Sequence, residues 1–477
     1  MRKIFGNIVS LLTSDVMNRA TTFLIYALVA RYLGDFAFGQ ISLALLLFYT
    51  FYVFASLGVR VYITREIARD PSLTDRYLVN GSLLILAASV LSVLALVIFV
   101  WVMSYELSTA RLVLIVGLAI VPYALTTVCE AVFQAHERMH FIAYANLPHN
   151  VLKVAATIFL LTQGYGAEPL AVMLVVSYTL TFVLEWFFIL RYISRPTWTV
   201  DMPFASSMIK GVLPFLGLES VIAIWASLNA LILSRVGNEI DVAMYNAAMQ
   251  VLVPVSLVLQ SIVMSLFPMM CREYETGGSG MQVVYEDLME LLLMVTLPAV
   301  VGIIFLAEPI LLLFYGNESF ANATIVLQIV AWSLIPMALN RALGQVLLAS
   351  LREKITLRIV IVNSVLSLII GILLIASSGI IGAAIATVAA RLVNLGQQYV
   401  PVSQVVNSVA IGKSIWKATL ASLGMGLYLA AFAEQLGLWL AIPTGALVYG
   451  ALLGLIIIWS HGGLQGVRMR YAHLRSK

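Results

Sequence analysis

Four basic side chains of this 477-residue sequence lie inside long apolar runs, where a charge has little water around it. Charged groups in such surroundings are costly and usually face a polar cavity. Two acids, Asp15 and Glu219, lie comparably deep, so positive charge exceeds negative charge there. Because arginine offers a planar fork of donors and lysine a compact charge, this excess predicts a binding site for an anion such as phosphate. The four bases are Arg19, Lys153, Arg341 and Arg391.

Uncharged polar residues accompany these bases at helical spacing. Intervals of four, three and four residues separate the polar positions around Lys153, and the same intervals recur around Arg391. Such spacing puts the side chains on one face of a helix. The two stripes are Asn146, Asn150, Lys153, Thr157 and Thr387, Arg391, Asn394, Gln398. The sequence therefore predicts a polar cavity, with Asn18, Asn150, Asn246, Gln250 and Asn394 along its wall.

Each of these residues also has a purely structural interpretation. Asp15 and Arg19 are four residues apart and could neutralise each other on one helix. Asparagine and glutamine inside membrane helices often bridge neighbouring helices. If Asp15 or Glu219 does more than this, exchange of a proton or a sodium ion is the function that an intramembrane acid suggests.

The elements that must position these residues are membrane-spanning helices. The composition is 62% hydrophobic and 10% charged, with a mean hydropathy of +1.01, whereas soluble domains carry about 25% charged residues. Apolar runs of about 20 residues, the length of a bilayer crossing, recur throughout, and runs of this length satisfy their backbone in lipid as helices. The fourteen predicted segments are 8–30, 38–60, 78–104, 110–134, 140–163, 168–192, 208–234, 243–270, 286–312, 321–347, 355–377, 380–404, 414–434 and 437–460.

The orientation follows from the distribution of basic residues. Of 27 lysines and arginines, 20 lie in the even-numbered connections or at the termini, and 3 lie in the odd-numbered connections. Because basic residues favour the cytoplasmic side, both termini are predicted to be cytoplasmic. This topology also accounts for the net charge of +4, so no nucleic-acid partner is predicted.

An internal repeat relates the two halves of the chain at a shift of 214 residues. Residues 122–138 align without a gap to residues 336–352, so that Pro122 meets Pro336 and Arg138 meets Arg352. Helices 4–5 thus match helices 10–11, and by extension helices 1–6 match helices 7–12. Parallel repeats of this kind are a transporter architecture. The predicted domains are a six-helix lobe over 1–200, a second over 201–408, and two extra helices with a tail over 409–477.

Two motifs are considered and set aside. His136-Glu137-Arg138-Met139-His140 matches the metalloprotease pattern H-E-x-x-H, but it falls in the predicted connection between helices 4 and 5, and its repeat partner contains no histidine. Gly412-Lys413-Ser414 would need a glycine five residues earlier to form a phosphate loop, and Asn407 stands there. No metal and no cofactor are therefore predicted.

The N-terminal region carries a more specific signal. It contains Arg31-Tyr32-Leu33-Gly34 with Phe38-Gly39, then Leu57-Gly58, then Arg65-Glu66-Ile67-Ala68. With these residues the chain resembles the polysaccharide-biosynthesis or oligosaccharide flippases, the polysaccharide transport family of the multidrug/oligosaccharidyl-lipid/polysaccharide exporter superfamily. The family usually has an acidic or proline pair after Leu-Gly, where this chain has Asp35-Phe36-Ala37.

The resemblance implies both a fold and an activity. The fold is an all-α polytopic membrane protein of about 14 helices, with two six-helix lobes around a central cavity and two C-terminal helices. The activity is movement of a polyprenyl-diphosphate-linked oligosaccharide from the cytoplasmic to the outer leaflet of the plasma membrane by alternating access, without enzymatic chemistry. The expected partners are this substrate, membrane lipid, and a polysaccharide polymerase with other export machinery.

Two other functions stay open. A multidrug or cation antiporter of the same superfamily should favour acids in its cavity, whereas this chain favours bases. A membrane polysaccharide polymerase or ligase should place catalytic residues in a sizeable external loop, and no predicted connection exceeds about 16 residues.

Overall fold

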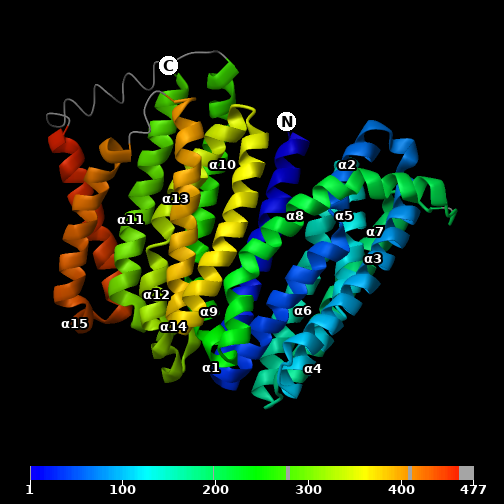
Figure 1. The fold of residues 1–477 in the computed structure, drawn as a ribbon, viewed down its shortest axis with the longest axis horizontal. Coiled ribbons are helices and arrows are strands. Elements are labelled where there is room, and N and C mark those ends of the chain that lie inside the picture. Colours follow the sequence, from blue (N-terminus) through cyan, green and yellow to red (C-terminus); the bar gives the residue numbers. More distant parts are fainter. Residues whose placement is uncertain (1, 197, 276–279, 407–410, 461–477) are drawn as a thin grey trace. The chain divides into compact units, whose positions relative to one another are not determined.

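In a computed structural model of the chain, all regular structure in the described residues is helical (Figure 1). The structure describes the backbone of residues 2–196, 198–275, 280–406 and 411–460. The side chains of residues 2–15, 218, 275 and 411–414 lie outside that description, and so does the C-terminal tail from residue 461.

Each of the fourteen predicted apolar segments is largely helical. The helices are α1 (Arg2–Ser56), α2 (Val59–Arg69), α3 (Thr74–Met103), α4 (Leu107–Gly117), α5 (Ile120–Ala135), α6 (His140–Thr162), α7 (Ala167–Tyr192), α8 (Met202–Val236), α9 (Glu239–Val251), α10 (Val253–Glu275), α11 (Gly280–Tyr315), α12 (Thr324–Ala331), α13 (Leu334–Ala349), α14 (Glu353–Ser403) and α15 (Ile411–Ser460), with 3-10 turns at Pro71–Leu73 and Glu318–Ala323.

The described residues hold ten stretches that are long and apolar enough to cross a membrane. Three of them, Val16–Arg69, Glu353–Ser403 and Ile415–Ser460, have lengths of 54, 51 and 46 residues, enough for two crossings each. Helix α6 is not one of these ten stretches, because the polar residues on one of its faces lower its mean hydropathy. The arrangement is thus a multi-pass membrane fold, and it is compatible with fourteen crossings.

Glycines interrupt the three long stretches. Gly34, Gly379 and Gly437 have φ values of 81°, 54° and 64°, a left-handed conformation that glycine adopts without a Cβ clash. Gly34 lies in the connection between the predicted segments 8–30 and 38–60, where its left-handed conformation lets the chain reverse. Beyond the second break, a Cβ on Gly382 would lie 1.9 Å from the carbonyl oxygen of Leu374, which shows how closely the two arms of α14 approach each other.

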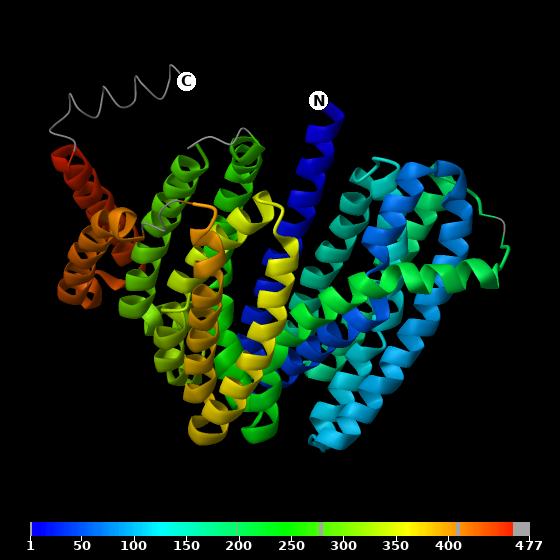
Figure 2. The same ribbon diagram turned by 45° about the horizontal axis from the view of Figure 1, so that its top comes forward.

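The chain forms two compact units, residues 1–246 with 315–317 and residues 247–314 with 318–477, here called the first and second units. In the first unit α1 packs against α3, α4, α5, α6 and α7, while α2 packs on α5 and α8. The helices α3, α5, α6 and α7 run side by side in both views of this unit (Figures 1 and 2). The three-part domain division stays a prediction.

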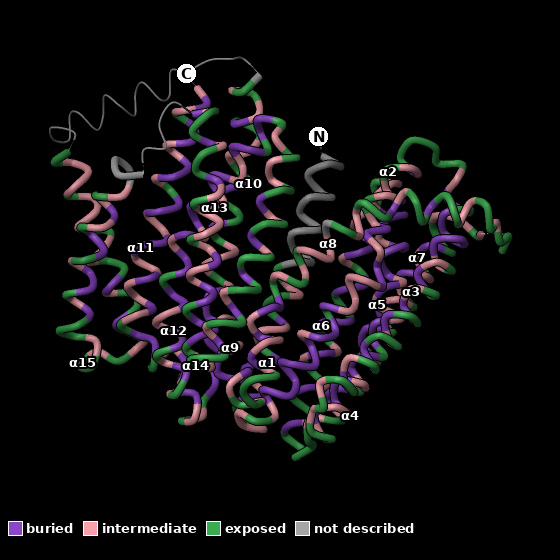
Figure 3. Tube along the Cα trace, in the orientation of Figure 1, coloured by how far each residue is buried: buried purple, intermediate pink, exposed green. Residues whose placement is uncertain are grey.

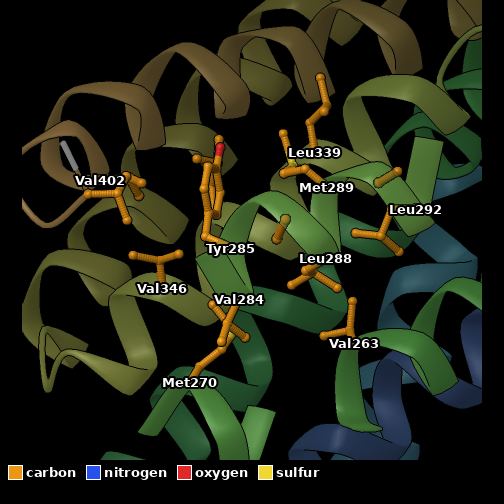
Figure 4. Close-up of a cluster of buried hydrophobic side chains, with 14 of the residues drawn as sticks. Val263, Met270, Val284, Tyr285, Leu288, Met289, Leu292, Leu339, Val346 and Val402 are labelled. Atoms are coloured by element: carbon orange, nitrogen blue, oxygen red, sulfur yellow. The ribbon is translucent and has the colours of Figure 1, made fainter. Parts of the chain in front are cut away.

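The second unit has a core of its own, in which α13 packs against α10 and α14. Tyr285 and Leu288 of α11 lie there among aliphatic side chains from α13 and α14, such as Val346 and Val402 (Figure 4). Tyr285 is 1% exposed, and the other three side chains are fully buried. This core is made of apolar contacts and carries no candidate site residue.

The outward faces of both units are apolar as well. Buried and exposed residues alternate along the helices (Figure 3), and the exposed positions include large side chains such as Ile98 and Trp101 of α3, which are 62% and 80% exposed. A soluble protein would not leave so much apolar surface in water. These faces therefore meet lipid, as the hydropathy of the sequence predicts.

Backbone conformation confirms the internal repeat for the segments that the sequence aligned. Helices α4 and α5 are separated at residues 118–119, and α12 and α13 are separated at 332–333, which is the same shift of 214. The same shift relates Glu137 and Leu351, two non-glycine residues with φ values of 56° and 57°. Such conformations are uncommon for non-glycine residues, so their repetition indicates that the two helix pairs share one backbone path.

The H-E-x-x-H pentapeptide spans the break between α5 and α6. His136 follows the end of α5, His140 opens α6, and Glu137 lies between them in the left-handed conformation. The zinc pattern needs both histidines on one face of a continuous helix, and that geometry is not present at these residues. Instead His136 Nε2 lies 2.9 Å from the hydroxyl of Thr74.

The connection between α7 and α8 is fastened to the start of α3. Asp201 caps α8 by accepting from Phe204 N at 3.0 Å, pairs with Arg76, and donates its own backbone N–H to Asn80 Oδ1 at 2.8 Å. These interactions favour the ionised carboxylate. The backbone hydrogen bond from Phe204, and then the Arg76 guanidinium, lower the pKa of Asp201 below its ordinary value.

We expect Asp201→Ala to lower the apparent melting temperature of the detergent-purified protein at neutral pH. A carboxyl whose folded-state pKa is depressed stabilises the fold above its unfolded-state pKa, about 3.9, and this contribution disappears as pH falls through the folded-state pKa. The deficit of the variant should therefore shrink below about pH 4. Asp201→Asn keeps a cap acceptor for Phe204 but loses the charge beside Arg76. Its melting temperature at neutral pH should therefore lie between those of wild type and Asp201→Ala. A deficit that is unchanged at low pH would contradict this assignment.

Candidate functional site

The polar stripe of α6 points into the first unit. Asn146, Asn150, Lys153 and Thr157 are each at least 91% buried, at the predicted spacing. Asn150 Nδ2 donates to Asn18 Oδ1 of α1 at 2.5 Å and to the carbonyl of Asn146 at 2.9 Å. The prediction that these residues share one face is confirmed, and Asn18 and Asn150, predicted to line one cavity, are in direct contact.

Lys153 is the most deeply buried of the four predicted bases, with 4% of its surface exposed. Its Nζ lies 5.5 Å from the centroid of the Tyr178 ring on α7, within the range of a cation–π interaction. In the part of the chain whose side chains are described, no carboxylate forms an ion pair with it. A buried ammonium in such surroundings favours the approach of an anion.

Aromatic side chains continue from Tyr178 across the interior of the first unit. The Tyr178 and Tyr49 hydroxyls lie 3.2 Å apart, and the Tyr123 ring lies 4.7 Å from Tyr178 and 4.6 Å from Tyr52, centroid to centroid. His149 Nδ1 lies 2.8 Å from the carbonyl of Ser177 on α7. The cluster joins α1, α5, α6 and α7, and it offers hydroxyl groups in an otherwise apolar interior.

A second charged cluster follows beyond these tyrosines. Arg60 Nη1 of α2 pairs with Glu130 Oε2 of α5 at 2.8 Å, and Arg60 Nε donates at 2.8 Å to the amide oxygen of Gln134 in the orientation that satisfies both groups. Glu185 of α7 is fully buried and interacts electrostatically with Glu130 and Arg60. Glu185 is not among the site residues predicted from the sequence, although Ser177, Thr181 and Glu185 form a buried stripe at spacing four.

The two predicted bases of the second unit are bound by neighbouring groups. Arg341 of α13 donates to Gln260 Oε1 at 2.6 Å and to the Ser256 hydroxyl at 2.9 Å, both on α10. Arg391 of α14 donates to the carbonyl and the hydroxyl of Ser333 at 3.0 and 2.9 Å. Each guanidinium therefore has an oriented hydrogen-bonding environment within its own unit.

The remaining predicted residues are placed as follows. Asn394 Oδ1 accepts from Gln398 Nε2 at 2.9 Å on α14, and Asn246 and Gln250 are half-buried on α9. Arg19 is exposed on α1 and interacts electrostatically with Tyr49. Glu219 of α8 is half-buried and interacts with Arg60, so it belongs to the second charged cluster. The side chain of Asp15 lies outside the described residues. The combined four-base site stays a prediction.

These arrangements are suited to binding an anionic or polar ligand. The first unit offers a buried ammonium, amide groups and hydroxyls within a few helical turns of one another. Such a set can hold an anionic or hydroxyl-rich ligand through charge and hydrogen bonds. Among the residues whose side chains are described, no group of three or more histidine, cysteine or acidic side chains is arranged to hold a metal ion.

Comparison with known proteins gives two family matches and several related structures. The sequence model of the family described as "MatE" matches residues 217–373. The "Probable low-salt glycan biosynthesis flippase Agl15" of Haloferax volcanii is 23% identical over 449 residues, covering 92% of this chain and 93% of that protein.

Two solved structures share the fold over most of their length. A structure of "Lipid II flippase MurJ, inward closed conformation" has a TM-score of 0.75 at 20% identity and covers 94% of this chain and 98% of that one. An inward-facing multidrug resistance MATE family transporter of the MOP superfamily has a TM-score of 0.66 at 15% identity, covering 85% and 100%. Finally, the model of the family described as "Polysaccharide biosynthesis protein" matches residues 4–273, more than half of the chain, and the protein belongs to this family.

Proposed function

We propose that this protein is a flippase for a polyprenyl-diphosphate-linked oligosaccharide. It carries the lipid-linked sugar from the cytoplasmic to the outer leaflet by alternating access. The observation that carries the proposal is the buried Lys153 with its polar stripe inside the first unit. Membership of the polysaccharide biosynthesis family, and a relative that is called a glycan biosynthesis flippase, support the same substrate class.

In this proposal the charged and the polar residues have different roles. The diphosphate is held by Arg19, Lys153, Arg341 and Arg391, because guanidinium and ammonium groups suit phosphate oxygens. The hydroxyl groups of the sugar contact the amides of Asn18, Asn150, Asn246, Gln250 and Asn394, while the prenyl tail stays in lipid. Ion coupling through Asp15 or Glu219 is part of the sequence-based prediction.

The cellular setting is proposed on the same basis. The excess of basic residues in the even-numbered connections favours cytoplasmic termini. A protein that supplies oligosaccharide to the outer leaflet works in the plasma membrane, beside a polysaccharide polymerase and other export machinery that consume its product. It moves its substrate without making or breaking covalent bonds.

A multidrug antiporter is the second candidate, because the MatE model and a MATE structure both match this chain. A pump for organic cations needs acids at its binding site, whereas the buried charge beside the α6 stripe is the cation Lys153. Cells that express the protein should therefore gain no resistance to cationic dyes.

Deletion of the gene tests the flippase function directly. We expect the lipid-linked oligosaccharide precursor to accumulate, as measured by mass spectrometry of extracted lipids, and the surface glycan to disappear. Labelling with a membrane-impermeant reagent should place the accumulated precursor on the inner leaflet. A precursor that still reaches the outer leaflet at the normal rate would overturn the proposal.

A further inference from the structure

Two equivalent positions of the internal repeat hold acids in the first unit and uncharged residues in the second. At the shift of 214 residues that aligns α5 with α13, Glu130 corresponds to Gly344. Glu130 acts electrostatically on Glu185, because α5 packs on α7. The corresponding contact of the second unit is that of α13 with α14. The equivalent of Glu185 on α14 therefore shows what replaces this pair of acids.

That equivalent is Gln398. The break at Gly379 divides α14 into two arms, and a shift of 213 residues relates Gly379 to Gly166, the residue before α7. At this shift the burial patterns of α7 and the second arm agree, since seven positions are buried in both, including those of Glu185 and Gln398. The second unit thus has a glycine and an amide where the first unit has two carboxyl groups.

Gly344 leaves open space beside the Gln398 amide. A Cβ on Gly344 would lie 3.6 Å from Gln398 Oε1, so these two residues face each other across α13 and α14. Apart from the backbone of its own helix and its chain neighbours, no other atom of the described residues lies within 4 Å of that Cβ. The first unit has a glutamate side chain at this position, so the second unit has room there for part of a ligand.

Two amide oxygens beside this space lack a hydrogen-bond donor. Gln398 is 7% exposed, and its Nε2 donates to Asn394 Oδ1 at 2.9 Å, but its Oε1 has no partner among the described residues. Asn340 lies one turn before Gly344 on α13. Its Nδ2 donates to the carbonyl of Arg391 at 2.8 Å, and its buried Oδ1 likewise has no partner there. Buried polar atoms are normally hydrogen-bonded, so both oxygens call for a donor from a ligand.

The neighbouring charges limit the chemistry of that ligand. The guanidinium groups of Arg341, next to Asn340 in sequence, and of Arg391 disfavour a metal cation through charge repulsion. An anion would meet two amide oxygens, which can only accept hydrogen bonds. An uncharged group that carries O–H or N–H donors suits both oxygens. In a polyprenyl-diphosphate-linked oligosaccharide only the sugar offers such groups, because the ionised diphosphate accepts hydrogen bonds and the prenyl tail makes none.

We propose that Asn340, Gly344 and Gln398, here called the α13–α14 seam, bind the sugar of the lipid-linked oligosaccharide, an inference that rests on the proposed flippase function. A hydroxyl or an acetamido N–H of the sugar donates to Gln398 Oε1, and a second donor reaches Asn340 Oδ1. The edge of the sugar ring occupies the space beside Gly344. Because Asn340 is bonded to the backbone of Arg391, one of the bases expected to hold the diphosphate, the sugar unit at the seam is one close to the diphosphate.

A binding experiment with two lipids tests the seam. The probes are the lipid-linked precursor extracted from the deletion strain and polyprenyl diphosphate without sugar, each titrated by native mass spectrometry into purified protein. Gln398→Met replaces the amide by an apolar side chain of similar length. It should weaken binding of the precursor by about tenfold, equivalent to about 1.4 kcal/mol, which is the upper part of the range for an uncharged hydrogen bond. Binding of polyprenyl diphosphate should not change.

Gly344→Ala tests the open space without removing a polar group. The added methyl group would lie at an ordinary contact distance from Gln398 Oε1, so the protein should fold normally. It would occupy the space of the sugar and should weaken binding of the precursor by tenfold or more, again without effect on polyprenyl diphosphate. Gly396→Ala is the matched control, because it adds the same methyl group to α14 with no atom within 4 Å. It should bind both lipids as the wild type does.

The comparison of the two lipids separates the possible outcomes. Equal weakening for both lipids would mean that the seam acts through the fold or the diphosphate, and unchanged precursor binding by Gln398→Met and Gly344→Ala would mean that only water occupies it. Either result overturns the proposal, and so does a wild type that binds the precursor no more tightly than polyprenyl diphosphate. A wild type that binds neither lipid would instead overturn the proposed flippase function, and this inference with it.

Discussion

Replacement of Lys153 by glutamine is expected to abolish most glycan export while the protein stays in the membrane. Lys153 is 96% buried and its ammonium lies over the Tyr178 ring, so no mobile surface lysine can take its place at that depth. A hydrogen bond to a charged group contributes about 1.5–3 kcal/mol, and loss of about 3 kcal/mol lowers affinity by about 150-fold. Glutamine keeps a polar side chain of similar length, so the loss reports on charge.

The measurement is surface glycan in a deletion strain complemented with each variant, with membrane levels checked by immunoblot. Lys210→Gln removes the same charge from an exposed position on α8 and should export normally. Arg19→Ala and Arg391→Ala extend the test to the other predicted bases. Normal export by Lys153→Gln, Arg19→Ala and Arg391→Ala would show that these side chains do not hold the diphosphate.

The parts of the molecule that follow from local chemistry could be predicted from the sequence. Backbone groups in lipid must be satisfied within each segment, so apolar runs are sufficient to locate the helices. The spacing of Asn146, Asn150, Lys153 and Thr157 identified the buried face of α6. The alignment of residues 122–138 with 336–352 predicted a shared backbone path, which Glu137 and Leu351 confirm.

The second charged cluster could not be predicted in the same way, because it depends on contacts between distant segments. Glu185 lies near the end of its apolar run, where an acid is usually close to water, yet it is fully buried on α7, which packs against α4, α5 and α6. Arg60 lies at the predicted cytoplasmic end of segment 38–60, yet it pairs with Glu130, 70 positions along the chain. Hydropathy gives the depth of a residue along a helix, but it does not give the side chains that neighbouring helices place there.

Gly39 shows the same limit on a smaller scale, since its place at the start of the predicted segment 38–60 does not reveal which backbone it packs against. The residue is helical in α1, and its φ lies outside the left-handed region. Its role comes from α9, because a Cβ on Gly39 would lie 2.0 Å from the carbonyl oxygen of Glu239 and 2.7 Å from its carbonyl carbon. The glycine therefore permits a close approach of two backbones that lie 200 positions apart in sequence.

The backbone of Glu239 has little freedom to move away from Gly39. Its side chain accepts a hydrogen bond from the Thr109 hydroxyl at 2.9 Å, and Gln40 Nε2 donates to the same hydroxyl oxygen at 3.0 Å. Gln40 also donates to Ser108 at 2.9 Å. Helices α1, α4 and α9 are thus joined at the position where an added methyl group would clash.

We therefore expect Gly39→Ala to destabilise the first unit by about 3 kcal/mol, the upper part of the usual range for overpacking. The helical conformation alone predicts the opposite sign, since alanine is favoured over glycine in a helix by about 1 kcal/mol. Gly217→Ala is the matched control, because it adds the same methyl group to a helical glycine of the same unit with no atom within 4 Å. Apparent melting temperature and the yield of monodisperse protein in detergent measure both variants. A Gly39→Ala protein as stable as Gly217→Ala would mean that α1 and α9 do not approach as closely as the structure has them.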